Sequence, residues 1–256
     1  MSSARTSRRA TAGAINQPPT TVSANEGGGR GASVGRAYDE IRELIVHGRL
    51  APGSRIIESD IAERLGLSRT PVRSALHRLQ QEGYVAMIDR MKETRLIVAP
   101  LTQADALELF QMVGHLEGLA ARTAAERPQE ERTEIVTRLR MLNGHLATAG
   151  LAVPSDPRRL FDHDTAFHRA YVEAGAGPRL QALHDAIKPQ AERYARLYVN
   201  SLVDEIGKSV EEHELINRAI EMGDAAGAQS AVENNWRNAA VRLARVIDSQ
   251  GERGSW

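Results

Sequence analysis

The sequence predicts a mainly α-helical protein in two parts: three helices and two short strands over residues 34–100, then six helices over 101–248. Apolar residues recur at three- and four-residue spacing through most of the chain, which is typical of amphipathic helices. Between 84 and 98, two short apolar runs flank a polar loop, which instead indicates paired strands. Pro and Gly residues divide the remaining chain into helices. These are expected near residues 102–126, 130–149, 156–174, 178–200, 204–222 and 224–248.

The composition of the 256 residues excludes several classes of protein. The chain has no cysteine, which excludes a disulfide scaffold, thiolate zinc sites and a cysteine nucleophile. Its apolar stretches are too short for a transmembrane helix, so we expect a cytoplasmic protein that does not bind a membrane. Basic and acidic residues balance at 33 each, but the net charge is +3 over residues 1–33, +2 over 34–100 and −5 beyond. The basic front part is therefore a candidate for contact with nucleic acid.

The two ends of the chain are predicted to lack a fixed structure. Residues 1–33 consist mainly of Ser, Thr, Ala, Gly and Arg, which bury too little apolar surface to fold, and we expect a disordered arm. The arm is either a solvated tail without function or, through its arginines, a source of non-specific attraction to phosphate. Residues 249–256 are expected to form a flexible tail.

The segment after the first predicted helix has the pattern of a helix-turn-helix. That first helix begins at Val34 and ends at Gly48. A short helix, Asp60–Leu65, is followed by Gly66, which allows the left-handed backbone of a sharp turn, and by a second helix with Pro71 in its first turn. In such motifs the first residues of the second helix contact base edges in the major groove, and Arg pairs with guanine O6 and N7. We expect these contacts from Ser68, which also caps the helix, and from Arg69, Thr70 and Arg73.

Two short strands, Tyr84–Ile88 and Leu96–Val98, complete the predicted first part, and a basic loop joins them. We expect the loop to be a wing that touches the DNA backbone or the minor groove through Arg90, Lys92 and Arg95. The alternative is an ordinary helical hairpin with surface arginines, which would not require these strands. The pattern therefore favours a winged helix-turn-helix that binds double-stranded DNA.

Asp164 and His168 are the most informative residues of the second part. They lie four residues apart on one helical face, and the apolar residues around them indicate that this face points inward. A buried carboxylate and imidazole require partners, because burying them alone is costly. Two interpretations follow: an i,i+4 ion pair with His213 at the surface, or a divalent-metal site that includes His213 from a facing helix. His163 and His184 are expected at helix surfaces or boundaries.

Leu67–Arg73, Leu79 and Glu82–Gly83 together resemble the winged-helix signature of the GntR family of bacterial transcription regulators. The resemblance implies that the family's DNA-contacting positions correspond to Ser68, Arg69, Thr70 and Arg73. Two features depart from the family pattern. Ser59 stands where a basic residue is common, and the wing lacks the glycine that the family often has.

The second part resembles the FCD-type effector-binding domain of the FadR-like branch of that family, through Asp164, Phe167–His168, Glu212–His213 and Gly223–Asp224. Many members of this branch bind a divalent metal through one Asp and three His, which implies a site of zinc or nickel type. Asp164, His168 and His213 match three of these positions, and Asn235 stands at the fourth. An amide oxygen is a poorer ligand for these metals than imidazole, which implies a weakened site or a different metal.

The family's effectors are commonly small organic acids or acyl derivatives, which implies an anion-binding cavity. Arg193 and Arg196, with Tyr194 between them, are the candidate ligands because the planar guanidinium suits a carboxylate. Trp236 is expected to line the same cavity. The alternative is that these arginines lie on a solvated helix face and that Trp236 fills the core.

Together the patterns predict a homodimeric, repressor-type regulator that binds an operator and senses a small organic acid beside a metal. The alternative from a different class is a metal-dependent enzyme in which Asp164, His168 and His213 hold a metal that activates water. That alternative leaves the winged part unexplained, and the sequence contains no nucleotide-binding glycine motif. We therefore expect a regulator and not an enzyme.

Overall fold

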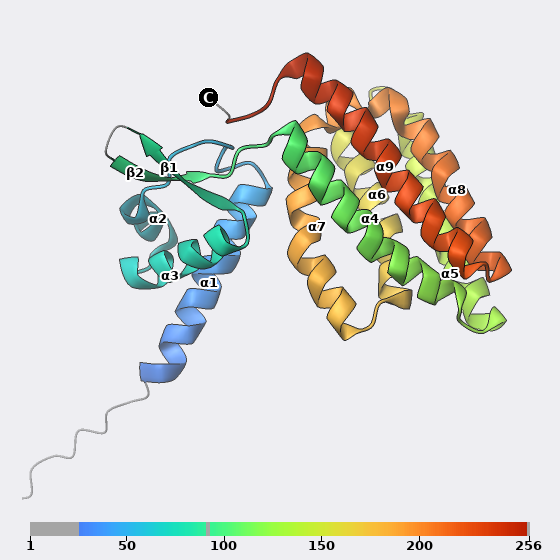
Figure 1. Ribbon diagram of the computed structural model, residues 1–256, viewed down its shortest axis with the longest axis horizontal. Helices are drawn as coiled ribbons and strands as arrows, with labels where there is room; N and C mark the ends of the chain where they lie inside the picture. The colour runs from blue at the N-terminus through green and yellow to red at the C-terminus, as the bar shows by residue number, and fades with distance from the viewer. Residues whose placement is uncertain (1–25, 91–92, 255–256) are drawn as a thin grey trace, which may run out of the picture.

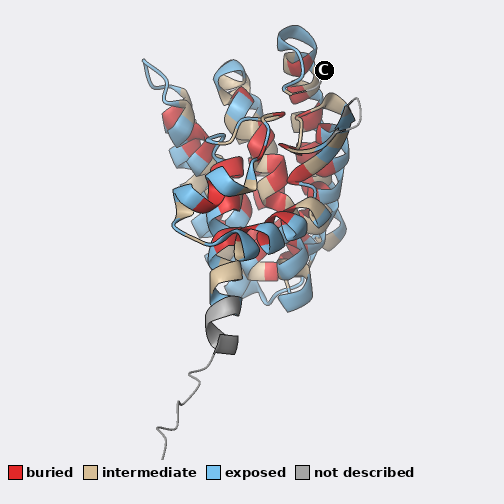
Figure 2. Cartoon of the chain, turned by 90° about the vertical axis from the view of Figure 1, so that its left-hand side faces the viewer, coloured by how far each residue is buried: buried red, intermediate tan, exposed pale blue. Residues whose placement is uncertain are grey.

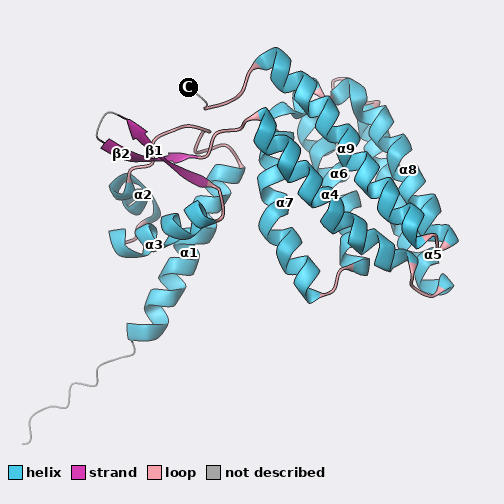
Figure 3. Ribbon diagram, in the orientation of Figure 1, coloured by secondary structure: helices cyan, strands magenta, loops and turns pink. Residues whose placement is uncertain are grey.

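The computed structural model describes residues 26–90 and 93–254 of the chain (Figure 1). Two units lie side by side: a winged unit, which holds both β-strands, and a larger helical unit. Figure 3 shows how little of the described chain is sheet. The predicted fold class, a winged helix-turn-helix followed by an all-α bundle of six helices, is confirmed over these residues.

The winged unit contains three helices and a two-stranded antiparallel sheet. Its elements are α1 (Glu26–Val46), α2 (Glu58–Leu65), α3 (Arg69–Gln81), β1 (Val85–Arg90) and β2 (Glu93–Val98). The strand register runs from Val85 opposite Val98 to Arg90 opposite Glu93. Apolar faces of the helices meet in one core with Ile41, Val72 and Leu79. Because α1 packs across α3, it fixes the position of the second helix of the helix-turn-helix.

The helical unit is a bundle in which long helices connect through short turns. Its helices are α4 (Gln103–Ala125), α5 (Gln129–Gly150), α6 (Pro157–Gly175), α7 (Pro178–Tyr198), α8 (Ile206–Met222) and α9 (Ala225–Gln250). Two 3₁₀ turns, Val199–Ser201 and Val203–Glu205, join α7 to α8. Buried residues gather between the helices, whereas their outer faces are exposed (Figure 2). All six helices were predicted, with ends within a few residues of those observed.

Helix α4 lies at the centre of this bundle and is approached closely by its neighbours. It packs against α6, α7, α8 and α9. Small residues permit the approach: a Cβ added at Gly175 of α6 would lie 1.9 Å from the Ala120 main-chain oxygen of α4. Gly175, which the sequence indicated only as a break between helices, is the last residue of α6 and lies where the backbones of α4 and α6 cross.

The N-terminal arm differs from the expectation where the structure describes it. Helix α1 begins at Glu26, eight residues before the predicted helix start at Val34, so the predicted disordered arm does not extend over residues 26–33. Once a helix is nucleated, adding residues at its end is cheap, and the buried turn around Ala37 and Ile41 supplies that nucleus. The rest of the arm, with Arg5, Arg8 and Arg9, lies outside the described residues.

The C-terminal segment is not a free tail as far as Gly254. Main-chain hydrogen bonds of 2.8 and 3.0 Å pair Arg253 with Leu101, in the connection between the two units. The Gly254 backbone also packs against Gly53 in the turn of the winged unit. The expectation of a flexible tail over 249–256 missed this pairing because its partner is distant in the sequence. The last two residues lie outside the described part.

None of the helices within residues 26–90 and 93–254 combines the length and the apolar character needed to cross a bilayer.

Candidate functional site

The helix-turn-helix forms as the sequence indicates. Gly66 adopts the left-handed conformation (φ 61°, ψ 36°) that ends α2, and Ser68 takes the extended N-cap conformation before α3, although its side chain makes no capping hydrogen bond. The apolar residues of α3 point into the core, so its opposite face lies in solvent. The residues exposed at the start of α3 are Ser68, Arg69, Thr70 and Arg73. The structure thus brings the four predicted DNA contacts together on one exposed surface.

The wing is only partly described. Arg90 ends β1, and Arg95 lies in β2 opposite Ile88 and is half-buried. Lys92 lies outside the described residues. The hairpin itself was predicted, but the contribution of these three side chains to DNA contact stays a prediction.

Asp164, His168 and His213 form a three-residue cluster in the helical unit. The first two lie on α6 and the third on α8, and one candidate ligand atom from each lies within 4.8 Å of the others. The Nε2 atoms of His213 and His168 lie 3.6 and 3.9 Å from the Asp164 carboxylate oxygens. His213 is completely buried and stacks on Phe167 at 3.9 Å, so the interpretation that places it at the surface is wrong.

Hydrogen bonds at the far side of each imidazole fix its orientation. His168 donates from Nδ1 to Glu117 Oε2 at 2.7 Å, and His213 donates from Nδ1 to Asn143 Oδ1 at 3.1 Å. Asn143 in turn donates to the Val210 carbonyl, which sets the direction of its amide. In the neutral, Nδ1-protonated form of each ring, Nε2 presents a lone pair toward Asp164.

The state of His213 suits metal ligation. Burial lowers the pKa of His213 well below the ordinary value of an imidazole, so the ring is neutral at pH 7. Its Nε2 is a buried polar atom without a hydrogen-bond partner among the described residues. A buried polar group left in this state is costly unless something else binds it. Two imidazoles and one carboxylate oxygen are a donor set that fits a divalent transition metal.

Glu117 on α4 is the residue that sequence reasoning missed. Its carboxylate is fully buried and accepts five hydrogen bonds of 2.6–3.0 Å. The donors are His168 Nδ1, Tyr171 OH, His184 Nε2, Lys188 Nζ and Trp236 Nε1. Burial alone would raise the pKa of Glu117, but Lys188 and His168 hold it well below its usual range. The carboxylate is therefore ionised and ties four helices together at one point.

His184 corrects an expectation made from the sequence. It was assigned to a helix surface or boundary, yet only 6% of it is exposed, because its ring points from α7 to Glu117. A single histidine at helical spacing gives no sign of a partner on a helix 67 residues away.

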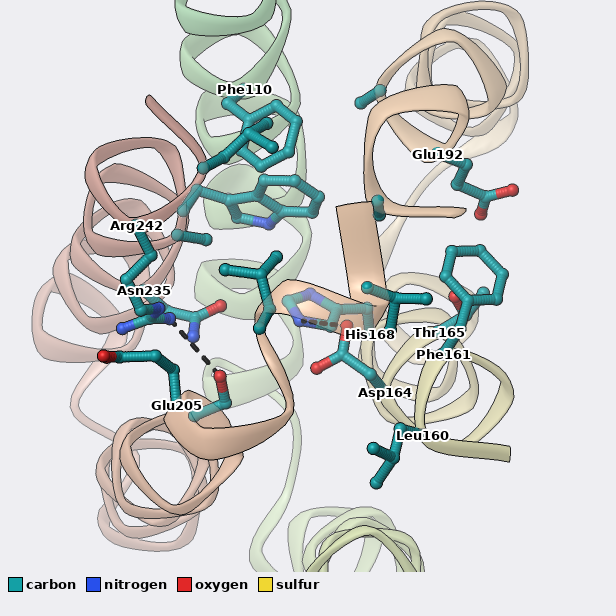
Figure 4. A pocket seen from close by; sticks show the side chains of 18 of the residues that line it. Phe110, Leu160, Phe161, Asp164, Thr165, His168, Glu192, Glu205, Asn235 and Arg242 are labelled. Carbon is teal, nitrogen blue, oxygen red and sulfur yellow. Dashed lines mark hydrogen bonds and ion pairs between the residues drawn. The ribbon is translucent and has the colours of Figure 1, made fainter. Parts of the chain in front are cut away.

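A cavity of ≈110 Å³ opens beside the cluster. Phe110, Leu160 and Phe161 form part of its apolar wall. In Figure 4, Asp164 and His168 lie on one side of it, with Asn235 and Arg242 across from them. Apolar walls with a few convergent polar groups are typical of small-molecule sites.

Of the predicted effector ligands, only Trp236 lines this cavity. Arg193 donates to the Ala99 carbonyl at 2.8 Å, and the Tyr194 hydroxyl accepts from the Thr102 N–H at 3.1 Å, so both hold the connection between the two units instead. Tyr194 also donates to Asp105 of α4. Arg196 lies 4.1 Å over the Phe161 ring and lines a separate cavity of ≈390 Å³ between α1 and α7. These three side chains of α7 therefore point to different partners and do not line the cavity together.

Two other cations line the cavity in their place, Arg242 and Lys188. Arg242 pairs with Glu212 at 2.8 Å and donates to Ser209 Oγ at 3.3 Å. Asn235, which also lines the cavity, donates from its amide nitrogen to Glu212 at 2.8 Å. Glu212 thus fixes both polar side chains of this wall.

Comparisons with known proteins place the two units in one family. The model of the bacterial regulatory proteins of the gntR family matches residues 34–91, and the FCD domain model matches residues 108–238, about half of the chain. The chain belongs to the GntR family, with an FCD domain. This GntR-family protein is a transcription regulator, and none of the comparisons supports the alternative of a metal-dependent enzyme.

Relatives of this protein include other transcription regulators. An HTH-type transcriptional regulator of Agrobacterium vitis is 34% identical over 122 residues, which cover 48% of this chain and 70% of the relative. A probable D-xylose utilization operon transcriptional repressor of Paenarthrobacter nicotinovorans is 26% identical over 77% of this chain and 84% of its own. The solved structure of E. coli McbR/YncC has a TM-score of 0.63 at 19% identity, covers 83% of this chain and 97% of its own, and supports the fold alone.

Proposed function

We propose that this regulator is a homodimeric repressor that binds a double-stranded operator in the cytoplasm and changes its operator affinity when a small organic acid binds beside a metal. The observation that carries the sensing part is the convergence of the Nε2 atoms of His168 and His213 on the Asp164 carboxylate, at the wall of a cavity that also contains Arg242. Repression is the role named for the Paenarthrobacter relative.

Operator binding is assigned to the exposed start of α3. Ser68, Arg69, Thr70 and Arg73 enter the major groove, and the wing residues Arg90, Lys92 and Arg95 add contacts to the backbone. A two-fold dimer presents two such surfaces, so the operator contains two related half-sites.

The metal is assigned to Asp164, His168 and His213, with the amide oxygen of Asn235 as the fourth ligand. Glu117 and Asn143 orient the two imidazoles, as outer partners commonly do for metal-binding histidines. When bound, the metal supplies a positive charge and an open coordination position for one carboxylate oxygen of the effector.

The effector is assigned to the cavity, with Arg242 as the residue that binds its carboxylate. The planar fork of Arg242 is held by Glu212 and Ser209, so little entropy is lost when it binds a carboxylate. Lys188 adds positive charge on the same cavity, and Trp236 forms part of the wall. The effector shifts operator affinity only if it binds the two arrangements of the winged units unequally.

The test is the metal content of purified protein, together with zinc and nickel titrations of chelator-treated protein by calorimetry. Wild type and the control variant His163→Ala are expected to bind one metal per chain, whereas His213→Ala loses most of its affinity. His163 is half-buried on the same helix as Asp164 and His168, but its ring packs against the ring of His145. Equal binding by wild type and His213→Ala would remove the assigned site.

A second measurement tests the sensing role. A thermal-shift screen of small organic acids, with and without added metal, identifies a ligand through the stability that binding adds. An Arg242→Met variant is expected to lose that shift, and unchanged shifts would show that the acid binds elsewhere.

A further inference from the structure

Glu58 and Arg73 form a bidentate ion pair across the helix-turn-helix. Arg73 donates from Nε to both carboxylate oxygens of Glu58 at 3.1 Å and from Nη2 to Oε2 at 2.9 Å. Glu58 is the first residue of α2, and Arg73 lies in the second turn of α3. The Nη2 atom of Arg69 lies 3.8 Å from the same carboxylate. One carboxylate therefore faces two of the proposed DNA-contacting side chains.

The atoms used in this pair leave the other edge of Arg73 available. A guanidinium has five N–H donors in a rigid plane, and Glu58 occupies the side edge formed by Nε and Nη2. No described residue accepts a hydrogen bond from Nη1, and 67% of the Arg73 side chain is exposed. The end edge, Nη1 and Nη2, carries the two donors that pair with O6 and N7 of guanine.

We propose that Glu58 is a positioning residue that determines base specificity, because it holds Arg73 from the side and presents its end edge to one guanine of each half-site. The inference rests on the proposed role of α3 in operator binding. Glu58 itself touches no base in this scheme. It limits the conformations of Arg73 before DNA arrives.

Stability alone does not account for the pair. Exposed ion pairs contribute little to folding, because two long side chains lose entropy and water screens the charges. Placing an acidic group beside a DNA-binding surface also reduces non-specific attraction to phosphate. The pair instead restricts the conformations of the Arg73 side chain, so less conformational entropy is lost when Arg73 binds its base.

The charge of Glu58 persists at neutral pH. The hydrogen bond from Arg73 lowers the pKa of Glu58 below its usual value, so the carboxylate stays ionised. Glu58 also lies at the N-terminus of α2, where the helix dipole favours a negative charge.

The experiment selects DNA from a randomised duplex library with the full chain, for wild type and four variants. Arg73→Ala removes the proposed base contact, Glu58→Gln removes the charge, and Glu58→Asp keeps the charge but shortens its reach. Glu63→Gln is the matched control, since Glu63 is exposed on the same helix and carries the same charge. Circular dichroism and thermal unfolding establish that each variant is folded.

The readout is the affinity for the selected duplex divided by that for the same duplex with 7-deazaguanine, which lacks N7, at the selected guanine. Wild type and Glu63→Gln are expected to discriminate by about tenfold or more, within the range of a bidentate contact. Arg73→Ala loses this preference, and Glu58→Gln and Glu58→Asp lose most of it. Affinity for unrelated duplex stays equal or rises in Glu58→Gln, because a negative charge has been removed.

Two results would overturn the inference in different ways. Full guanine preference in Glu58→Gln and Glu58→Asp, with loss in Arg73→Ala, would show that Arg73 needs no positioning by Glu58. Wild-type preference in Arg73→Ala, or no enriched sequence with wild type, would instead remove the proposed role of α3, and the positioning role with it.

Discussion

Arg42 on α1 donates a hydrogen bond from Nη2 to the main-chain oxygen of Asp185 on α7, at 3.0 Å. Its Nε also donates to the hydroxyl of Tyr84, at 3.3 Å. The neighbours of Asp185 on α7 include His184 and Lys188, which both bind the carboxylate of Glu117. Glu117 binds His168 of the proposed metal site, so contacts run without a break from that site to the winged unit.

Replacing Arg42 with Met is expected to weaken the coupling between metal and DNA. Operator affinity without metal stays close to wild type, since Arg42 is not among the proposed DNA contacts. The change in operator affinity on adding zinc is expected to be smaller in the variant than in wild type. Coupling free energies between two sites are typically about 1–3 kcal/mol. Fluorescence anisotropy with labelled operator measures it, and Arg49→Ala, exposed just after α1, is the control. A zinc response equal to that of wild type would show that coupling takes another route.

Glu117→Gln is expected to destabilise the helical unit. The neutral glutamine amide leaves the Lys188 ammonium, which is only 8% exposed, without its counter-charge. The amide NH₂ group would also face hydrogen-bond donors where the Glu117 carboxylate accepts from them. Breaking a buried ion pair typically costs about 3–5 kcal/mol. Urea denaturation followed by circular dichroism gives the change, with Glu211→Gln on an exposed face as the control. A cost below about 0.5 kcal/mol, the range of surface changes, would contradict the assigned role.

Replacing Gly175 and Gly144 with alanine is expected to change the free energy of unfolding in opposite directions. Gly175→Ala places a methyl group 1.9 Å from the Ala120 oxygen, which forces α4 and α6 apart and costs about 1–3 kcal/mol or more. Gly144→Ala lies inside α5, where the added Cβ has no described side chain or neighbouring element within 4 Å apart from its two chain neighbours, and it stabilises by roughly 0.5–1 kcal/mol. Thermal unfolding of both variants distinguishes them, and equal melting temperatures would contradict the close crossing.

Asn235→His is expected to strengthen zinc binding. Imidazole is a better zinc ligand than an amide oxygen, and it would complete a set of one carboxylate and three imidazoles. The substitution also removes the hydrogen bond to Glu212, so Asn238→Ala, which removes another bond to the same carboxylate, is the matched control. Calorimetry with zinc is the measurement. If Asn235→His binds zinc with the same affinity as wild type, residue 235 is not a metal ligand.

Local spacing predicted those features whose cause is local. Gly66 and the apolar residues of α3 placed the helix-turn-helix correctly, because turn conformation and helical periodicity depend on neighbouring residues. Asp164 and His168 were paired correctly for the same reason, since residues four apart share a face. Asn235 was placed beside them only through the family resemblance.

Features that depend on how helices meet could not be predicted in this way. Glu117 lies in an apolar stretch of α4 with no partner nearby in the sequence, and its five donors come from α6, α7 and α9. Arg193 and Arg196 were expected in one cavity, but residues three apart on α7 point to different neighbours once the winged unit packs against that helix. Periodicity indicates which side chains share a face, not which helix covers it.

The pairing of Arg253 with Leu101 gives the winged unit two attachments to the helical unit where the covalent chain alone would give one. The first is the connection from Val98 to Gln103, and the second is the returning segment that ends against Gly53. A body fixed at one point can rotate about any axis, whereas a body fixed at two can only swing about the line that joins them. With both backbone attachments in place, the only rotation that they leave to the winged unit is about that line, and the hydrogen bond from Arg42 to the Asp185 main-chain oxygen opposes it.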